Sequence, residues 1–195
     1  MSQTILTTQR LILRPYEPGD WVAAHQYGGD AETCQYQRWG PNTEDETREF
    51  VEDCVEASTW PEELGYYYAI TLKEDGTLIG GCNLCHVSKT DSGAMIGYTI
   101  NRDYWRQGYT SEAAAALLEL GFTEAGLHRI VSWCTPENIG SWKVMEKIGM
   151  RREGHEREAV WFKGEWHDWL RYALLDYEWL KRQSALRQSR TEPVS

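Results

Sequence analysis

The chain has 195 residues, of which 41% are hydrophobic and 26% are charged, values typical of one globular domain with a buried core. No apolar run approaches the roughly 18 residues of a membrane span, and the first residues lack the basic and apolar segments of a signal peptide, so we expect neither. A net charge of −10 argues against nonspecific nucleic-acid binding and suits a cationic amine ligand, although it also serves solubility alone.

Periodicity and turn residues predict a mixed succession of strands and helices. Strands are expected where apolar residues alternate or run together between turns, and helices where they recur every three or four residues. In chain order we expect a strand over 11–15, a helix started by Pro18-Gly19-Asp20 with Asp20 at the cap, a helix over 43–59, strands over 66–72, 78–87 and 94–100, a helix over 111–125, a strand over 129–135, a helix over 138–148, strands over 151–162 and 166–175, and a helix from 176 to about 187. This order indicates an α/β (α+β) fold with one central, mostly antiparallel sheet and helices on both faces.

Five cysteines are scattered along the chain, an odd number that suits a reducing cytoplasm better than a disulfide scaffold. Cys82 and Cys85 form a Cys-x-x-Cys pair, but the sequence offers no second pair to complete a zinc site. Both lie in an expected strand, where residues three apart face opposite sides. We therefore interpret them as small core or edge residues, and we expect no metal site and a cytoplasmic location.

An anion site is expected in the segment Tyr104-Trp105-Arg106-Gln107-Gly108-Tyr109-Thr110-Ser111-Glu112-Ala113, where Arg-Gln-Gly leads into an Ala-rich helix. A tight turn that opens a helix leaves backbone N–H groups without partners. These donors and the positive end of the helix dipole attract an anion of phosphate size. The segment has neither the Lys-Ser/Thr of a P-loop nor a G-x-G-x-x-G motif. An ordinary strand-to-helix turn is the alternative.

A second segment of the same shape follows further along the chain. The β-type run over 130–134 ends just before Pro136, Asn138 can cap the short helix that follows, and Gly149 can close that helix. Two strands that each deliver a helix N-terminus would form one polar notch between them.

Together the two segments resemble the GNAT superfamily of acetyl-CoA-dependent N-acetyltransferases, most closely the Rim-type branch that acetylates ribosomal-protein N-termini. The resemblance runs from about Thr8 to Trp179, and we expect one acetyltransferase domain over 8–180 followed by a C-terminal tail over 181–195. The superfamily loop reads Gln/Arg-x-x-Gly-x-Gly/Ala, from which Trp105 and Thr110 depart; Rim-type members often have Trp in that first place. Thr110 adds bulk where the pyrophosphate approaches, which bears on cofactor affinity.

The resemblance implies acetyl-CoA as co-substrate, without a metal, and a splay between the strands over 94–100 and 129–135. It assigns the pyrophosphate to the backbone amides of the loop, namely those of Arg106, Gln107, Gly108, Tyr109, Thr110 and Ser111. It assigns the pantetheine arm to freed backbone groups of Tyr98, Thr99 and Ile100, one of which can polarise the thioester carbonyl. It also implies that the Asn138 side chain holds the pantetheine; a plain helix cap is the alternative.

For the chemistry, Ser141 is the candidate that protonates the departing thiolate, because it shares a helix face with Asn138 and the place of the Tyr found in other branches holds Met145. Local hydrogen bonding is its alternative role. The general base is less defined. The Rim-type Glu corresponds to Val160, so the candidates are Glu158, on the same strand face by period 2, and Asp168 across the hairpin. No dedicated base is the third option.

The leading hypothesis is therefore acetyl transfer from acetyl-CoA to a primary amine, either a protein N-terminal α-amine or a small molecule, by direct attack in a ternary complex. We expect no nucleic-acid or membrane partner, and a homodimer is compatible with the resemblance. A non-catalytic acyl-CoA-binding module is the alternative that Thr110 and Val160 motivate. Acetylation of an antibiotic or polyamine is a third, motivated by the acidic Glu44-Asp45-Glu46, although such residues also favour a helix start.

Overall fold

A single eight-stranded sheet forms the centre of the computed structural model, which describes residues 4–59, 65–88 and 90–191. Its spatial order is β1-β2-β3-β4-β5-β6-β8-β7. The strands are β1 (Leu6–Thr7), β2 (Leu11–Pro15), β3 (Gly65–Leu72), β4 (Leu78–Ser88), β5 (Gly93–Ile100), β6 (Arg129–Cys134), β7 (Arg151–Phe162) and β8 (Glu165–Leu175). All neighbouring pairs are antiparallel except β5 and β6, which run parallel, so the predicted mostly antiparallel sheet is confirmed.

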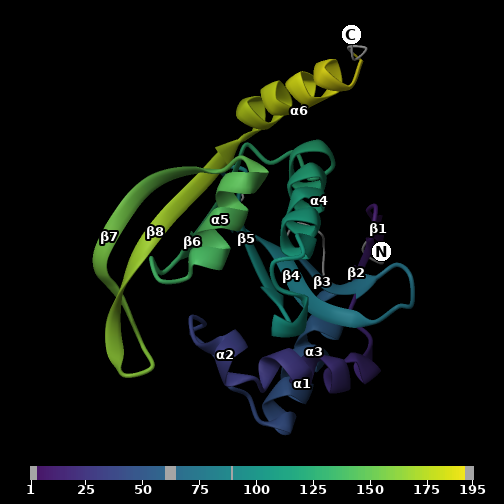
Figure 1. The fold of residues 1–195 in the computed structure, drawn as a ribbon, viewed down its shortest axis with the longest axis vertical. Coiled ribbons are helices and arrows are strands. Elements are labelled where there is room, and N and C mark those ends of the chain that lie inside the picture. Colours follow the sequence, from purple (N-terminus) through teal and green to yellow (C-terminus); the bar gives the residue numbers. More distant parts are fainter. Residues whose placement is uncertain (1–3, 60–64, 89, 192–195) are drawn as a thin grey trace.

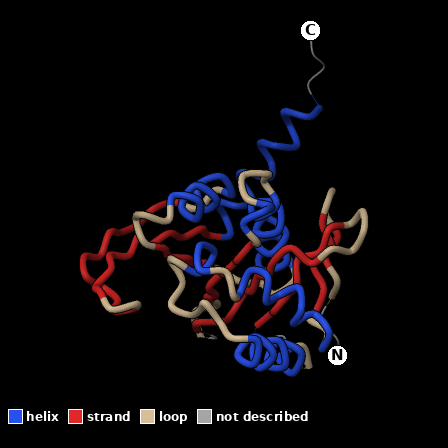
Figure 2. Tube along the Cα trace, turned by 60° about the horizontal axis from the view of Figure 1, so that its bottom comes forward, coloured by secondary structure: helices blue, strands red, loops and turns tan. Residues whose placement is uncertain are grey.

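Helices lie on both faces of this sheet, as predicted (Figure 1). They are α1 (Trp21–Gly28), α2 (Ala31–Cys34), α3 (Glu44–Ala57), α4 (Tyr109–Thr123), α5 (Ile139–Ile148) and α6 (Asp176–Thr191), with 3-10 turns η1 (Pro18–Asp20) and η3 (Arg102–Tyr104). Helix α4 begins two residues earlier than expected, and α6 continues past the expected end near residue 187. Figure 2 shows α6 projecting from the body of the domain.

Two apolar clusters, one on each sheet face, explain the arrangement. Along β3, Tyr68 and Ile70 are fully buried in the larger cluster, which α4 and α5 cover. Ala69 between them faces the smaller cluster, where it meets Tyr27 of α1 and Val51 of α3. This alternation is the period of two expected for a strand that is buried on both faces.

The starts of α3 and α1 differ in whether a side chain caps the helix. The Thr43 hydroxyl accepts the Glu46 N–H and the Glu46 carboxylate accepts the Thr43 N–H, a capping box that starts α3 where predicted. Asp20 occupies the expected position before α1 but makes no side-chain cap bond to that helix. Its carboxylate instead accepts the Arg14 guanidinium at 2.7 and 2.8 Å and the Glu17 N–H at 2.7 Å.

The sheet opens between its two parallel strands. β5 and β6 pair only from Gly93 to Met95, although both strands continue beyond that point. At the divergence the buried Ser132 hydroxyl donates to the Ile96 carbonyl at 2.9 Å, which satisfies one backbone group that the missing strand pairing leaves free. The splay implied by the family resemblance is thus present.

The β7–β8 hairpin extends beyond the helices, and its tip bends toward α2 (Figure 1). Lys163 at the tip donates to the Gly40 carbonyl in the connection between α2 and α3. The ladder shifts register between Glu156 and Val160, and Glu158 adopts a φ of +48° within this bulge. Period-2 alternation therefore fails here: Val160 is buried, whereas Glu158 is exposed. The expectation that these two residues share a strand face is wrong.

The two cysteines of the Cys-x-x-Cys pair lie on opposite sides of β4, as predicted. Cys82 is buried in the larger apolar cluster, and Cys85 donates to the Tyr67 hydroxyl on the other face. Within the described part of the chain, the structure contains no group of three or more His, Cys, Asp or Glu side chains placed to hold a metal. Across the same residues, none of the helices has both the length and the apolar character to cross a bilayer.

Candidate functional site

The turn before α4 presents a row of unpaired backbone donors. Gly108 is the N-cap of α4 with a φ of +84°, and Arg106 has a φ of +60°, so the backbone turns sharply twice before the helix begins. The amides of Gly108, Tyr109, Thr110 and Ser111 precede the first intrahelical bond, which the Glu112 N–H donates to the Gly108 carbonyl at 3.1 Å. None of the four has a partner among the described residues. The predicted tight turn before the helix is thus present, and free amides at a helix N-terminus are donors suited to an anion. Anion binding by this loop stays a prediction.

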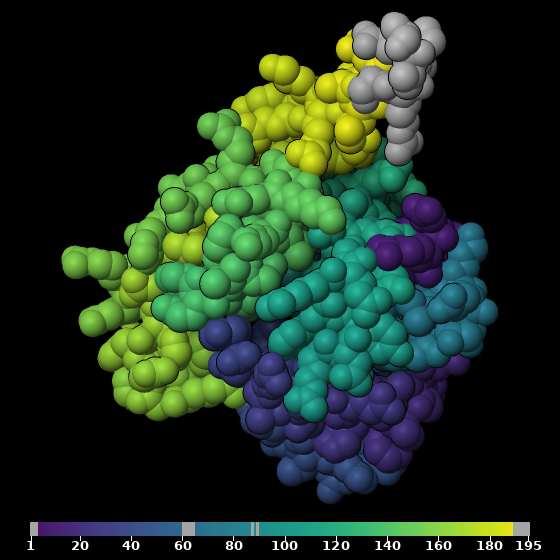
Figure 3. Space-filling model, in the orientation of Figure 1, coloured from purple at the N-terminus to yellow at the C-terminus, as the bar shows by residue number. Residues whose placement is uncertain are grey.

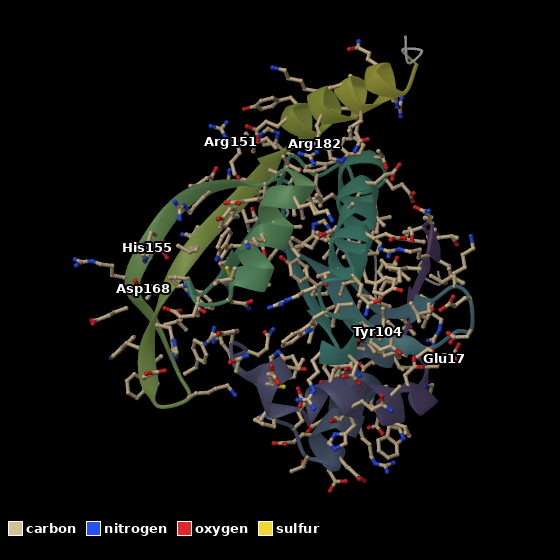
Figure 4. All side chains as sticks on the ribbon, viewed as in Figure 1. Glu17, Tyr104, Arg151, His155, Asp168 and Arg182 are labelled. Carbon is tan, nitrogen blue, oxygen red and sulfur yellow. The ribbon has the colours of Figure 1, made fainter. Side chains whose placement is uncertain are left out.

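A cavity of about 390 Å³ opens beside this loop, between α4, α5 and α6. Its wall carries three cations, Arg10, Lys147 and Arg182, together with apolar surface that includes Leu118 and Trp179. Arg182 lies where α6 crosses the end of α5 (Figure 4), and it donates to the Lys147 carbonyl at 2.6 Å. Neither Lys147 nor Arg182 forms an ion pair with a carboxylate in the described part of the chain. A positive cavity in a protein of net charge −10 is suited to a phosphorylated ligand.

Arg10 ties the loop to the edge of the sheet. Its backbone N–H and its Nε each donate to the Glu112 carboxylate at 2.8 Å, and its Nη1 donates to the Gln107 carbonyl at 3.0 Å. The Thr8 hydroxyl adds a bond of 2.6 Å to the same carboxylate. The N-terminal segment lies against α4 in Figure 3. We call these contacts the Arg10–Glu112 lock. The sequence did not predict them, because nothing in the local pattern links residues so far apart in the chain.

Fewer backbone groups of β5 are free to bind a ligand than predicted. The Asn101 N–H donates to the Ile79 carbonyl on β4, so by alternation the backbone groups of Thr99 also face β4, whereas those of Tyr98 and Ile100 face the gap toward β6. The Ile100 carbonyl is already occupied by the Trp105 indole N–H at 2.8 Å. The Tyr98 backbone and the Ile100 N–H are therefore the groups open to an extended ligand in the gap.

The first turn of α5 closes the other side of the gap. The side-chain Oδ1 of Asn138 caps the helix by accepting the Ser141 N–H at 3.1 Å, so the cap role is observed. The side-chain NH₂ group of Asn138 has no partner among the described residues. The Tyr98 hydroxyl lies 3.1 Å from the Ser141 carbonyl oxygen and 3.3 Å from its Oγ. Met145, one turn further along α5, is buried in the core.

Cys134 is a neighbour of Ser141 that sequence reasoning treated only as a strand residue. Burial raises the pKa of the Cys134 thiol to about 11, although the Ser141 hydroxyl and the Trp142 N–H both favour the thiolate. The Ser141 hydroxyl thus already lies within reach of a sulfur atom at the end of β6.

The two candidate bases lie apart from this cluster, on the β7–β8 hairpin. Asp168 accepts the Glu158 N–H at 2.8 Å and lies 2.6 Å from His155 Nε2, so its carboxylate fixes the bulge (Figure 4). These two hydrogen bonds lower the Asp168 pKa, the backbone bond contributing most. Glu158 meets Asp168 through its backbone only. A carboxylate with a lowered pKa is a weaker base, and the hairpin geometry gives the Asp168 carboxylate a structural role. The Glu158 side chain is exposed.

The opposite sheet face at the gap is lined by aromatic rings. Cys134 and Ile130 face the helices, so Trp133 between them faces away. Its ring centroid lies 6.5 Å from that of Trp169, which lies 6.4 Å from Phe162. The candidate site therefore has a polar side at the N-termini of α4 and α5 and an aromatic side on the opposite face of the sheet.

Comparison with known proteins gives concordant matches. The sequence profile of the acetyltransferase (GNAT) domain matches residues 10–151. The uncharacterized N-acetyltransferase YnaD of Bacillus subtilis is 38% identical over 89% of this chain and 98% of its own. The ribosomal protein uS5-alanine N-acetyltransferase of Escherichia coli is 26% identical over 89% and 92%. The crystal structure of a GNAT-family acetyltransferase from Bacillus anthracis is 37% identical, with a TM-score of 0.81 over 89% of this chain and 99% of that one.

The Arg10–Glu112 lock makes a testable pH prediction. Burial opposes ionisation of Glu112, but the bonds from Thr8 and Arg10 outweigh it and lower the Glu112 pKa. A lowered folded-state pKa stabilises the protein above the unfolded value of about 4.3, and this stabilisation is lost as the pH falls through the folded value. Glu112→Gln should therefore cost about 2 kcal/mol of unfolding free energy at pH 7, measured by urea denaturation, and progressively less below about pH 4.

Glu119→Gln on the same helix is the matched control, because the Glu119 carboxylate is exposed and forms no ion pair with any described residue. It should change stability by less than about 0.5 kcal/mol. An equal loss in both variants, or a loss at Glu112 that does not change with pH, would contradict the lock.

Proposed function

Because the chain belongs to the GNAT acetyltransferase family and is an acetyl-CoA-dependent N-acetyltransferase, we propose that it acetylates a primary amine by direct attack in a ternary complex. The observation that carries this proposal is the opening of the sheet between β5 and β6, beside which two helix N-termini converge. Such an opening offers unpaired backbone for a pantetheine arm and free amides for a pyrophosphate on one ligand path.

The residues present fit acetyl-CoA on structural grounds. A Cβ at Gly108 would lie 3.5 Å from Arg10 Nη2 and 3.7 Å from Lys147 Nζ, so two cations stand over a glycine that leaves the loop open. We assign the pyrophosphate to the amides of residues 106–111 and the nucleotide half to the cationic cavity. Thr110 lies in the first turn of α4, where its backbone amide, rather than its side chain, supplies the donor. The pantetheine arm follows the Tyr98 backbone, with the Asn138 amide group opposite.

The chemistry needs a polarised carbonyl and a proton for the leaving sulfur. In this proposal the Tyr98 N–H, directed into the gap, polarises the thioester carbonyl as an oxyanion donor does. The Ser141 hydroxyl supplies the proton to the sulfur as the carbon–sulfur bond breaks. Its position at the N-terminus of α5 supports this role, since the helix dipole favours the developing negative charge.

The acceptor approaches from the aromatic side, because α4 and α5 cover the other face of the gap. We propose a protein N-terminal α-amine as its class. With Asp168 and Glu158 held in the hairpin bulge, no strong base is evident in the described site, which favours an amine with a pKa near 8 over one above 10. A small amine such as a polyamine is the second candidate, but its support is weak: Glu46 in the acidic helix start is engaged in capping Thr43.

The acceptor class is tested by thiol release from acetyl-CoA with a panel of peptides, polyamines and aminoglycosides. We expect release with peptides that carry a free N-terminus, and none with the same peptides after N-terminal blocking. Release with polyamines alone would move the assignment to small amines. Clear CoA binding without release by any amine would contradict the proposal and favour the non-catalytic acyl-CoA-binding module.

Gly108→Val tests the loop. The left-handed conformation of Gly108 is unfavourable for a β-branched residue, so the loop amides should shift and lose two or more bonds of about 1 kcal/mol each, weakening CoA binding roughly tenfold or more. Calorimetry measures this affinity. Gly126→Val is the control, because Gly126 also has a positive φ, +62°, and open space around it, but lies at the far end of α4. Normal CoA binding by Gly108→Val would remove the loop assignment.

Ser141→Ala tests the proton donor. Loss of a general acid costs typically 10²–10⁴-fold, so kcat should fall by about 100-fold while the KM for acetyl-CoA stays within about twofold. Ser184→Ala on the exposed face of α6 should leave both constants unchanged. If the Ser141 variant loses affinity and turnover equally, the hydroxyl binds the cofactor and does not donate the proton.

A further inference from the structure

The Tyr98 side chain crosses the gap that the diverging strands leave. On β5, Ile96 and Ile100 are buried in the cluster under α4 and α5, so Tyr98 between them points to the same side. Pairing with β6 has already ended at Met95, and the phenol ring extends from the free part of β5 to the first turn of α5. The Tyr98 hydroxyl thereby reaches Ser141.

The hydrogen bonds at the end of this ring allow two arrangements. The Ser141 carbonyl oxygen, 3.1 Å away, can only accept, so in one arrangement Tyr98 donates to it and the Ser141 hydroxyl, 3.3 Å away, donates to the Tyr98 oxygen. In the other, Tyr98 turns its proton to Ser141 Oγ, and the Ser141 proton is free to point elsewhere. The carbonyl is not orphaned by this turn, because it also accepts an N–H within α5.

We propose that Tyr98 is the positioning residue of Ser141: it holds the Ser141 proton in the resting enzyme and directs it to the sulfur during turnover. This inference rests on the function proposed for Ser141. As the carbon–sulfur bond breaks, the electron pair stays on sulfur and the proton moves from Ser141 Oγ to sulfur. The Tyr98 hydroxyl donates to the Ser141 oxygen as it gains negative charge. Solvent returns a proton to Ser141 and receives the one that the acylated amine releases.

Tyr98 acts through Ser141 and is not itself the proton source. Burial raises the Tyr98 pKa well above its usual value, and the Ser141 bond offsets this only in part. The phenol therefore stays protonated over the working pH range, and it remains a donor to Ser141 Oγ throughout the cycle.

Tyr98→Phe removes the hydroxyl and keeps the ring in the core. We expect kcat to fall by about tenfold, with the KM for acetyl-CoA and the CoA affinity unchanged within about twofold. In a Ser141→Ala background, Tyr98→Phe should have no further effect on kcat, because the group that it positions is gone. Thiol release and calorimetry give the kcat, KM and affinity values for the single and double variants.

Tyr172→Phe is the matched control. Tyr172 on β8 is also buried, and its hydroxyl also bonds to α5, donating to Glu146 at 3.1 Å, but not to Ser141. Its removal should leave kcat unchanged. Full activity of Tyr98→Phe, a loss equal to that of Tyr172→Phe, or an additive loss in the double variant would overturn the proposal for Tyr98 while leaving that for Ser141 intact. Full activity of Ser141→Ala would overturn both.

Discussion

The parting of two parallel strands is the constraint on which the rest of this structure depends. β5 and β6 pair for three residues and then diverge, with Ser132 bonded across the divergence to Ile96. Buried backbone groups are rarely left unpaired, so an open sheet edge inside a domain needs something to occupy it. Here Ser132 and the Trp105 indole satisfy two of the carbonyls at this edge, and the Tyr98 backbone between them is left for a ligand. The hydrogen bonds that already occupy the Ile96 and Ile100 carbonyls thus limit which backbone groups of the gap a ligand can use.

The charge distribution follows from the same geometry. The two helices that flank the gap turn their N-termini toward it, so fixed dipoles supply positive potential without added charge. Arg10, Lys147 and Arg182 add to this potential in a chain whose overall net charge is −10. Glu112 is the acidic residue within this group; Arg10 neutralises its charge, and the Thr8 hydroxyl donates to its carboxylate. In our proposal this cationic cavity of an acidic protein takes the polyanionic co-substrate, and the acidic surface elsewhere suits a cationic acceptor.

Features that depend on neighbours in sequence were predictable. The start of α3 at Thr43 and the tight turn at Gly108 before α4 depend on local sequence, and each lies where the pattern indicated. Features that depend on distant contacts were not. The bulge at Glu158 breaks a strand alternation that periodicity assumed to be regular, and the Tyr98–Ser141 contact joins a strand to a helix through the fold alone. The succession of strands along the chain followed from periodicity, and the splay followed from the family resemblance. The spatial order of the strands and the use of each backbone group at the gap required the structure.

In our proposal one path, from the cationic cavity along the Gly108 loop to the β5–β6 divergence, holds acetyl-CoA with its sulfur beside Ser141. A crystal structure of the protein with CoA tests this most directly. We expect a diphosphate within hydrogen-bond distance of the amides of residues 106–111, an arm paired with the Tyr98 backbone, and a sulfur atom next to the Ser141 hydroxyl. A diphosphate away from the loop, or a sulfur directed away from α5, would contradict it.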